Sequence, residues 1–182
     1  MISKFGGGRM APKNNVNLEA LEKTAGGIRQ DAAKGKRTNR VEGTWNLAGG
    51  QPQFSAEIAF EGGKLTLEAD QPTFLGGGGT RPGPMLYALY GLASCFTATF
   101  VTVASQEGLP LEEAKATVEA DLDFSKVFGI ADLPIVEQVR VSLAVKSSAS
   151  REALERVLRL SEERCPAAWC LQNPIPLAAK LA

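Results

Sequence analysis

Apolar and polar residues alternate along two neighbouring segments in the first half of the chain. Residues 54–60 and 64–69 both follow a period of two, and Gly62 and Gly63 stand between them. Such alternation is typical of a strand that buries one face, and two glycines between two such runs favour a tight turn. The pattern therefore predicts a β-hairpin. A weaker alternation over residues 37–47 indicates one more strand.

A long apolar segment follows the hairpin. The stretch QPTFLGGGGTRPGP is rich in glycine and proline and predicts a loop, after which residues 85–107 predict a helix that Gly108 ends. Met85 to Ala104 carries no charge and is long enough to span a bilayer. Its small and hydroxyl-bearing residues, and the amphipathic strands on both sides, favour instead a helix buried on all sides in a soluble protein.

The second half of the chain repeats the two kinds of pattern. Residues 116–124 and 139–145 alternate again and predict two half-buried strands. Ser150 can cap an amphipathic helix, and Pro166 stops it. The chain end after Pro166 predicts a turn, or one turn of helix, followed by a short final strand.

This order of elements predicts an α+β fold in which antiparallel sheets cover helices. Residues 1–36 are expected to be an N-terminal extension, poorly ordered over 1–16 and then helical from a cap at Asn17 to about Ala33. Residues 37–182 form the α+β domain. A central helix this apolar needs more cover than one small sheet supplies, so we expect a homodimer that buries it.

The amino-acid composition limits the partners and the kinds of catalytic chemistry that we expect of the chain. Twenty basic residues balance twenty acidic ones, which argues against a nucleic-acid partner or an anionic membrane surface. The N-terminus lacks the apolar stretch of a secretory signal, so we expect a cytoplasmic protein with reduced thiols. The sequence contains no histidine. This absence excludes Ser-His, Cys-His and histidine-ligated metal chemistry, and we expect neither a metal nor another cofactor.

Three cysteines remain as candidate nucleophiles. Cys95 lies in the middle of the long helix, where one more buried residue is the simpler interpretation on local evidence, because burial alone makes a thiol inert. Cys165 lies at a helix end beside Arg164, which favours reactivity, although a packing role is an equal alternative. Cys170 completes a Cys-x4-Cys pair that is weak as a zinc half-site, and a small buried hydrophobic residue is the simpler interpretation.

The glycine run before Arg81 resembles a phosphate-binding loop only superficially. It lacks the Gly-Lys-Ser/Thr ending of a P-loop and the spacing of a dinucleotide fingerprint. The loop instead carries Arg81 to the start of a helix, where backbone donors and a cation converge. A solvated loop charge is the alternative interpretation of Arg81.

Taken together, DQPTFLGGGGTRPGPMLYALYGLASCFTAT and, 70 positions after Cys95, the segment ERCPAAWCLQNPIP resemble the OsmC/Ohr superfamily of osmotically inducible and organic hydroperoxide resistance proteins. The resemblance runs from about Val41 to the C-terminus. It implies an intertwined homodimer with two long central helices flanked by antiparallel sheets. It also implies a thiol peroxidase of organic hydroperoxides, in which Cys95 attacks the peroxide and Cys165 resolves the sulfenic acid as a disulfide that an unknown dithiol reduces.

Attack on a peroxide requires a thiolate, so a buried Cys95 requires a nearby cation. Arg37 and Arg40 are the positions most similar to the activating arginine of the family, and Arg81 is a substitute. Where the family usually carries a glutamate that orients this arginine, ten residues before Cys95, this chain has Met85.

The departure at Met85 leaves two hypotheses. Another carboxylate, such as Glu57 or Glu68 of the predicted hairpin, replaces the missing glutamate in an active peroxidase. Alternatively, the chain is a weak or inactive OsmC-like protein that binds a small hydrophobic ligand.

Overall fold

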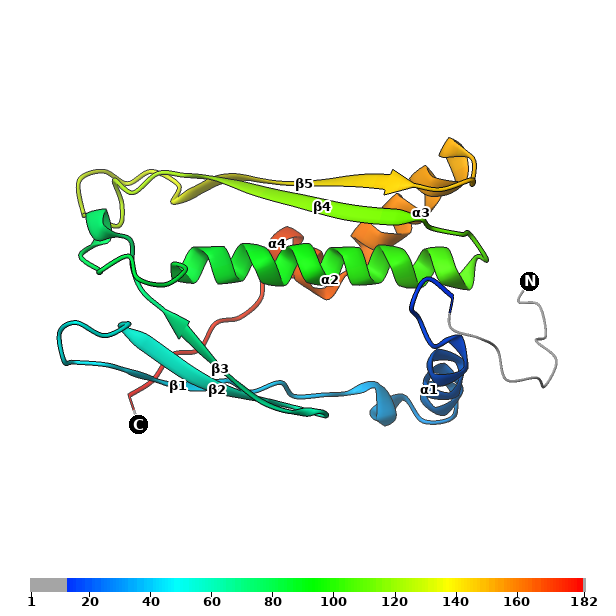
Figure 1. Ribbon diagram of the computed structural model, residues 1–182, viewed down its shortest axis with the longest axis horizontal. Coiled ribbons are helices and arrows are strands. Elements are labelled where there is room, and N and C mark those ends of the chain that lie inside the picture. The colour runs from blue at the N-terminus through cyan, green and yellow to red at the C-terminus, as the bar shows by residue number, and fades with distance from the viewer. Residues whose placement is uncertain (1–12, 182) are drawn as a thin grey trace. The chain divides into compact units, whose positions relative to one another are not determined.

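The computed structural model describes residues 13–181, and most of the predicted disordered lead-in lies outside this range. Contacts divide the chain into two units. The first combines residues up to Gly35 with residues from Leu92 onward, and the second holds Lys36–Gly91. Figure 1 shows the mixture of helices and antiparallel strands that the sequence predicts.

The second unit contains a three-stranded antiparallel sheet. Its strands β1 (Glu42–Trp45), β2 (Phe54–Phe60) and β3 (Gly63–Ala69) are paired in the order β1-β2-β3. Phe60 pairs with Gly63, and Gly63 has a φ of 147°, which only glycine adopts readily. The hairpin is therefore confirmed, whereas β1 is shorter than the alternation over 37–47 predicts.

The loop between β3 and the long helix is held by one carboxylate. Asp70 is almost fully buried and accepts hydrogen bonds from the backbone N–H and hydroxyl of Thr80 and from the N–H of Gly78. These bonds, those from Thr80 foremost, lower the pKa of Asp70. A Cβ at Gly77 would lie 2.0 Å from the carbonyl oxygen of Gln71, so this turn requires glycine. The hydrogen bonds of Asp70 and the close approach at Gly77 therefore explain why this loop is rich in glycine.

The helix α2 (Pro84–Gln106) runs from the second unit into the first. It ends where predicted, because Gly108 has a φ of 77° and its N–H bonds the Ser105 carbonyl. By length and composition it could cross a membrane. Within one chain only a stripe of α2 is buried, and Leu86 and Tyr90 are 59% and 71% exposed. Burial of its other side by a second copy stays a prediction.

The first unit covers part of α2 with a two-stranded sheet and two helices. The strands β4 (Glu113–Leu122) and β5 (Val136–Lys146) form an antiparallel ladder with one irregularity at Asp121/Leu122. Their apolar faces pack on the buried stripe of α2, together with α3 (Arg151–Arg164) and α4 (Pro166–Gln172) (Figure 1).

After α4 the described chain contains no strand, so the predicted final strand is wrong. Alternation there is broken by Pro174 and Pro176, which lack the N–H that a ladder needs. The sequence predicts a turn, or one turn of helix, after Pro166. In the structure this segment is the helix α4, which has seven residues.

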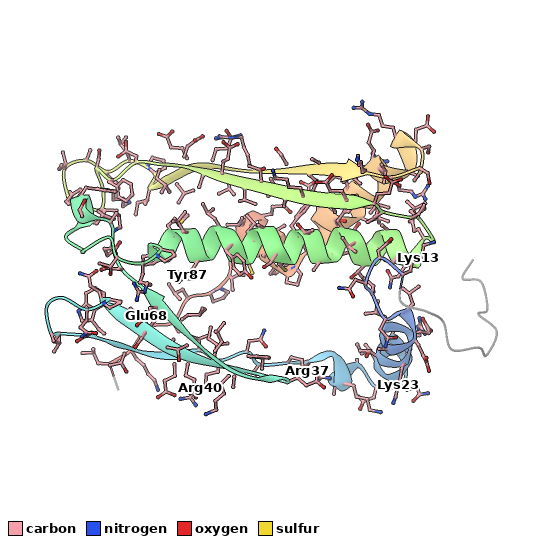
Figure 2. All side chains as sticks on the ribbon, in the orientation of Figure 1. Lys13, Lys23, Arg37, Arg40, Glu68 and Tyr87 are labelled. Carbon is pink, nitrogen blue, oxygen red and sulfur yellow. The ribbon has the colours of Figure 1, made fainter. Side chains whose placement is uncertain are left out.

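The N-terminal helix α1 (Leu18–Gln30) begins at Asn17, whose side chain accepts from the N–H of Ala20, and a 3₁₀ turn, η1 (Ala32–Gly35), follows it. Residues 13–16, just before α1, are held by hydrogen bonds to the end of α2, whereas the sequence predicts poor order up to residue 16. Lys13 bonds the Gly108 carbonyl and Asn14 bonds Ser105. Figure 2 shows Lys13 beside the end of α2. The start of the described chain is thereby fixed to the end of α2.

Candidate active site

Cys95 lies on α2 beside the stripe of residues that enters the core. The stripe has helical spacing, and its members up to the middle of the helix are Leu92, Phe96 and Phe100. Cys95 is partly buried and packs against this core from its edge. The sequence places the thiol on α2, but only the packing determines that one side of it faces the core and the other faces outward.

Cys165 occupies the junction between α3 and α4. Its backbone N–H closes α3 by bonding the Ser161 carbonyl at 2.9 Å, and its Sγ accepts from the N–H of Ala168 at 3.5 Å as the N-cap of α4. Pro166 has no N–H to continue α3 and suits the first position of α4. Cys165 is fully buried. Two helix ends therefore fix the position of this thiol.

The two sulfur atoms meet in the core. Cys95 Sγ and Cys165 Sγ are 3.5 Å apart, in hydrogen-bond contact, and both cysteines are unpaired thiols. A disulfide bond is about 2.05 Å long, so a small shift would join them. Two adjacent thiolates would repel each other, so one thiol ionises first and the neutral partner donates its S–H to it. The arrangement suits reversible disulfide formation.

The surroundings of Cys95 do not favour its thiolate. Burial is the largest cause that raises the pKa of Cys95, and the adjacent Cys165 raises this pKa further. The backbone N–H of Ala167, in the first turn of α4, donates to Cys95 and lowers the pKa, but the net direction is upward. At neutral pH the thiol form of Cys95 therefore predominates.

An open groove lies against the outward side of Cys95. Its volume is about 400 Å³, and Arg164 is the one charged residue in its lining. The rest of the lining comes from α2: Cys95, Ala98, Thr99, Thr102, Val103 and Gln106. The Thr99 hydroxyl already donates to the Cys95 carbonyl at 2.9 Å. Part of the Cys95 side chain is thus open to a small molecule.

The three arginines suggested by the sequence belong to the other unit. Arg40 pairs with Glu42, and Arg37 donates to the Lys36 carbonyl at 2.7 Å. Arg81 pairs with Glu68 at 2.7 Å and also bonds the Thr80 carbonyl. Cys95 and Cys165 are brought together, whereas a role for any of the three arginines at Cys95 stays a prediction.

Of the two carboxylates considered as replacements for the missing glutamate, only Glu68 pairs with a candidate arginine. The Tyr87 hydroxyl donates to the Glu68 backbone carbonyl at 2.7 Å, and Figure 2 shows the two residues close together. Glu57 instead pairs with Lys64 at 2.6 Å. Met85 is the second residue of α2 and is partly buried.

The simplest interpretation of Cys170, a buried residue, is wrong in this structure. It is exposed on α4 and not a small buried hydrophobic residue. The exposure of Cys170 depends on how α4 packs, and no local residue pattern indicates it. Among the described residues, no cluster of three or more His, Cys, Asp or Glu side chains is placed to hold a metal ion.

Comparison with known proteins yields one family. A family model described as OsmC-like protein matches residues 76–180, which include both thiols of the pair. None of the curated proteins matches the chain.

Solved structures with the same fold cover most of the chain at low identity. An OsmC-like protein from Mycoplasma pneumoniae is 19% identical, with a TM-score of 0.57, over 75% of this chain and 89% of its own. An organic hydroperoxide resistance protein OsmC from Legionella pneumophila is 21% identical, with a TM-score of 0.52, over 75% and 92%. An osmotic stress protein from Psychrobacter arcticus is 18% identical, with a TM-score of 0.55, over 73% and 88%. At such identities the likeness establishes the fold.

The raised pKa of Cys95 gives a measurable pH dependence. Iodoacetamide reacts with thiolates, so a raised pKa keeps alkylation of Cys95 slow at neutral pH and moves its midpoint above the ordinary thiol value of about 8.5. Rates are measured by mass spectrometry of the Cys95 peptide between neutral and alkaline pH. A midpoint below the ordinary value would contradict the raised pKa.

Proposed function

The chain belongs to the OsmC-like protein family, and from this premise we propose that it is a cysteine-based peroxidase that reduces organic hydroperoxides. The observation that carries the proposal is the contact of 3.5 Å between Cys95 Sγ and Cys165 Sγ. Names of relatives give further support, because proteins from Legionella pneumophila and Elizabethkingia anophelis with this fold are described as organic hydroperoxide resistance proteins.

In the proposed reaction, the Cys95 thiolate attacks one oxygen of the hydroperoxide. The O–O bond breaks, the sulfur becomes sulfenic acid, and the other oxygen leaves as an alcohol after it takes up a proton. Cys165 then attacks the Cys95 sulfur, releases water and closes a disulfide. A dithiol reductant restores both thiols. Cys95 is the attacking residue because it borders the open groove, whereas Cys165 is fully buried.

The raised pKa of Cys95 favours a slow peroxidase whose rate increases toward alkaline pH. The same pKa supports a second candidate function. In that alternative the chain is a weak or inactive relative, and the groove beside Cys95 binds a small hydrophobic ligand. Met85, in place of an orienting glutamate, agrees with either a slow or an inactive enzyme.

Trapping of the intermediate tests the order of the two thiols. In Cys165→Ser, one equivalent of an organic hydroperoxide should add one oxygen atom to Cys95, and dimedone should label that sulfenic acid. Serine is a good N-cap, so this variant preserves the start of α4. Mass spectrometry locates the label. A labelled Cys170, or an unchanged Cys95 with unconsumed peroxide, would refute the assignment, and Cys95→Ser provides the blank.

The activating arginine is identified by its effect on the ionisation of Cys95. We expect one of Arg37→Gln, Arg40→Gln and Arg81→Gln to raise the pKa of Cys95, because it removes the cation that stabilises the thiolate. The peroxidase rate at neutral pH would then fall about ten-fold or more, because the thiolate fraction falls. The other two variants serve as charge-matched controls. Equal rates in all three would favour the inactive alternative or a different cation.

We also propose that the active form is a homodimer in which α2 of each chain forms one of two central helices. The support is the exposed apolar face of α2, where Leu86 and Tyr90 stand one helical turn apart and are mostly exposed. Burial of such side chains stabilises association by about 1.5–3 kcal/mol each. The interface would thus account for the low burial of an uncharged helix.

Sedimentation should accordingly give twice the chain mass of 19.3 kDa. Tyr90→Lys should shift the protein toward the monomer, because it places a charge in the buried interface. Thr117→Lys, on the exposed face of β4, introduces the same charge and should leave the dimer intact. A monomer in the unmodified protein at micromolar concentrations would be evidence against the dimer.

A further inference from the structure

A single charge lies along the groove beside Cys95. The helix α2 supplies most of the lining and carries no charged side chain, and Arg164, the last residue of α3, is the exception. Ala98 and Val103 are apolar, and Thr99 already donates its hydroxyl to the Cys95 carbonyl. The groove therefore combines a thiol, a largely apolar wall and one cation.

The backbone of Arg164 is tied to the contact between the two thiols. Arg164 directly precedes Cys165, and consecutive Cα atoms are about 3.8 Å apart. Cys165 in turn closes α3 through its bond to the Ser161 carbonyl, and its sulfur lies 3.5 Å from the sulfur of Cys95. The same helix end that places Cys165 in the core therefore places Arg164 at the groove.

The guanidinium of Arg164 has no carboxylate partner within the part of the chain that the structure describes. The nearby Glu162 accepts a hydrogen bond from Gln172 at 3.1 Å instead. A guanidinium without a partner keeps its planar fork of N–H donors free for an acceptor with two oxygens, such as a carboxylate. Other arginines of the same unit are paired with aspartate or glutamate, namely Arg29, Arg140, Arg151 and Arg156.

The charge of Arg164 does not serve the thiolate of Cys95. Burial raises the pKa of Cys95, and Cys165 raises it further, although Arg164 lines the same groove. A guanidinium in contact with the sulfur would lower this pKa. Arg164 thus lies along the groove away from the sulfur, where a bound molecule can reach both groups.

We propose that Arg164 determines the substrate specificity of the site by binding the carboxylate of an organic hydroperoxide. The hydrocarbon part of this substrate lies on the apolar wall of α2, and its O–O group meets Cys95. The assignment rests on the proposed function, since it takes a hydroperoxide as the substrate. Because Arg164 is exposed, water weakens the ion pair, and the two parallel N–H bonds to the carboxylate supply the selectivity.

Two hydroperoxides that differ only in a carboxylate test this specificity. We expect kcat/KM to be about ten-fold higher for para-carboxy cumene hydroperoxide than for cumene hydroperoxide, which is the size of effect that a charged hydrogen bond gives. Arg164→Gln should abolish this preference, and Arg164→Lys should keep part of it. Arg159→Gln is the matched control, because Arg159 is an exposed residue of the same helix that does not line the groove. Equal kcat/KM values in the unmodified protein, or an unchanged preference in Arg164→Gln, would overturn the proposal.

A binding measurement without peroxide separates this inference from the peroxidase itself. At alkaline pH, where Cys95 reacts with iodoacetamide, 4-isopropylbenzoate should protect Cys95 in the unmodified protein and fail to protect it in Arg164→Gln. The neutral 4-isopropylbenzamide should protect about ten-fold less well. Protection by the carboxylate while hydroperoxide stays unconsumed would overturn the peroxidase and support the anion site. Equal protection by the amide, while hydroperoxide is reduced, would overturn the anion site and leave the peroxidase intact.

Discussion

The contact between Cys95 and Cys165 depends on one point of the backbone, where α3 ends and α4 begins. Pro166 prevents α3 from continuing, and Cys165 closes one helix and caps the next. These bonds hold its sulfur in the core, 3.5 Å from Cys95. The other half of the contact comes from the buried stripe of α2, which orients Cys95 toward the junction. A site of two thiols thus follows from the packing of three helices.

The burial that brings the thiols together also limits their reactivity. Removal of Cys95 from solvent raises its pKa, and a single N–H from Ala167 compensates only in part. A peroxidase at this site consequently needs a nearby cation, and Arg37, Arg40 and Arg81 are the candidates that we propose for it.

Much of the fold follows from patterns within short segments. The Gly62-Gly63 turn, the end of α2 at Gly108 and the cap at Ser150 are all predicted from local residue preferences and are confirmed. The final strand is not, because Pro174 and Pro176 lack the N–H that a strand ladder needs, and no described strand pairs with this segment. The proximity of Cys95 and Cys165 follows from the resemblance to a family, and spacing alone does not determine it. The direction of the Cys95 pKa and the exposure of Cys170 depend on tertiary packing and could not be predicted.

The central claim is that Cys95 and Cys165 react together with a hydroperoxide while Cys170 ends the reaction reduced. Counting of free thiols in the denatured protein, before and after one equivalent of cumene hydroperoxide, tests it directly. The account predicts a decrease from three free thiols to one, with consumption of the peroxide in equal amount. Three free thiols after the reaction, with the peroxide unchanged, would contradict it.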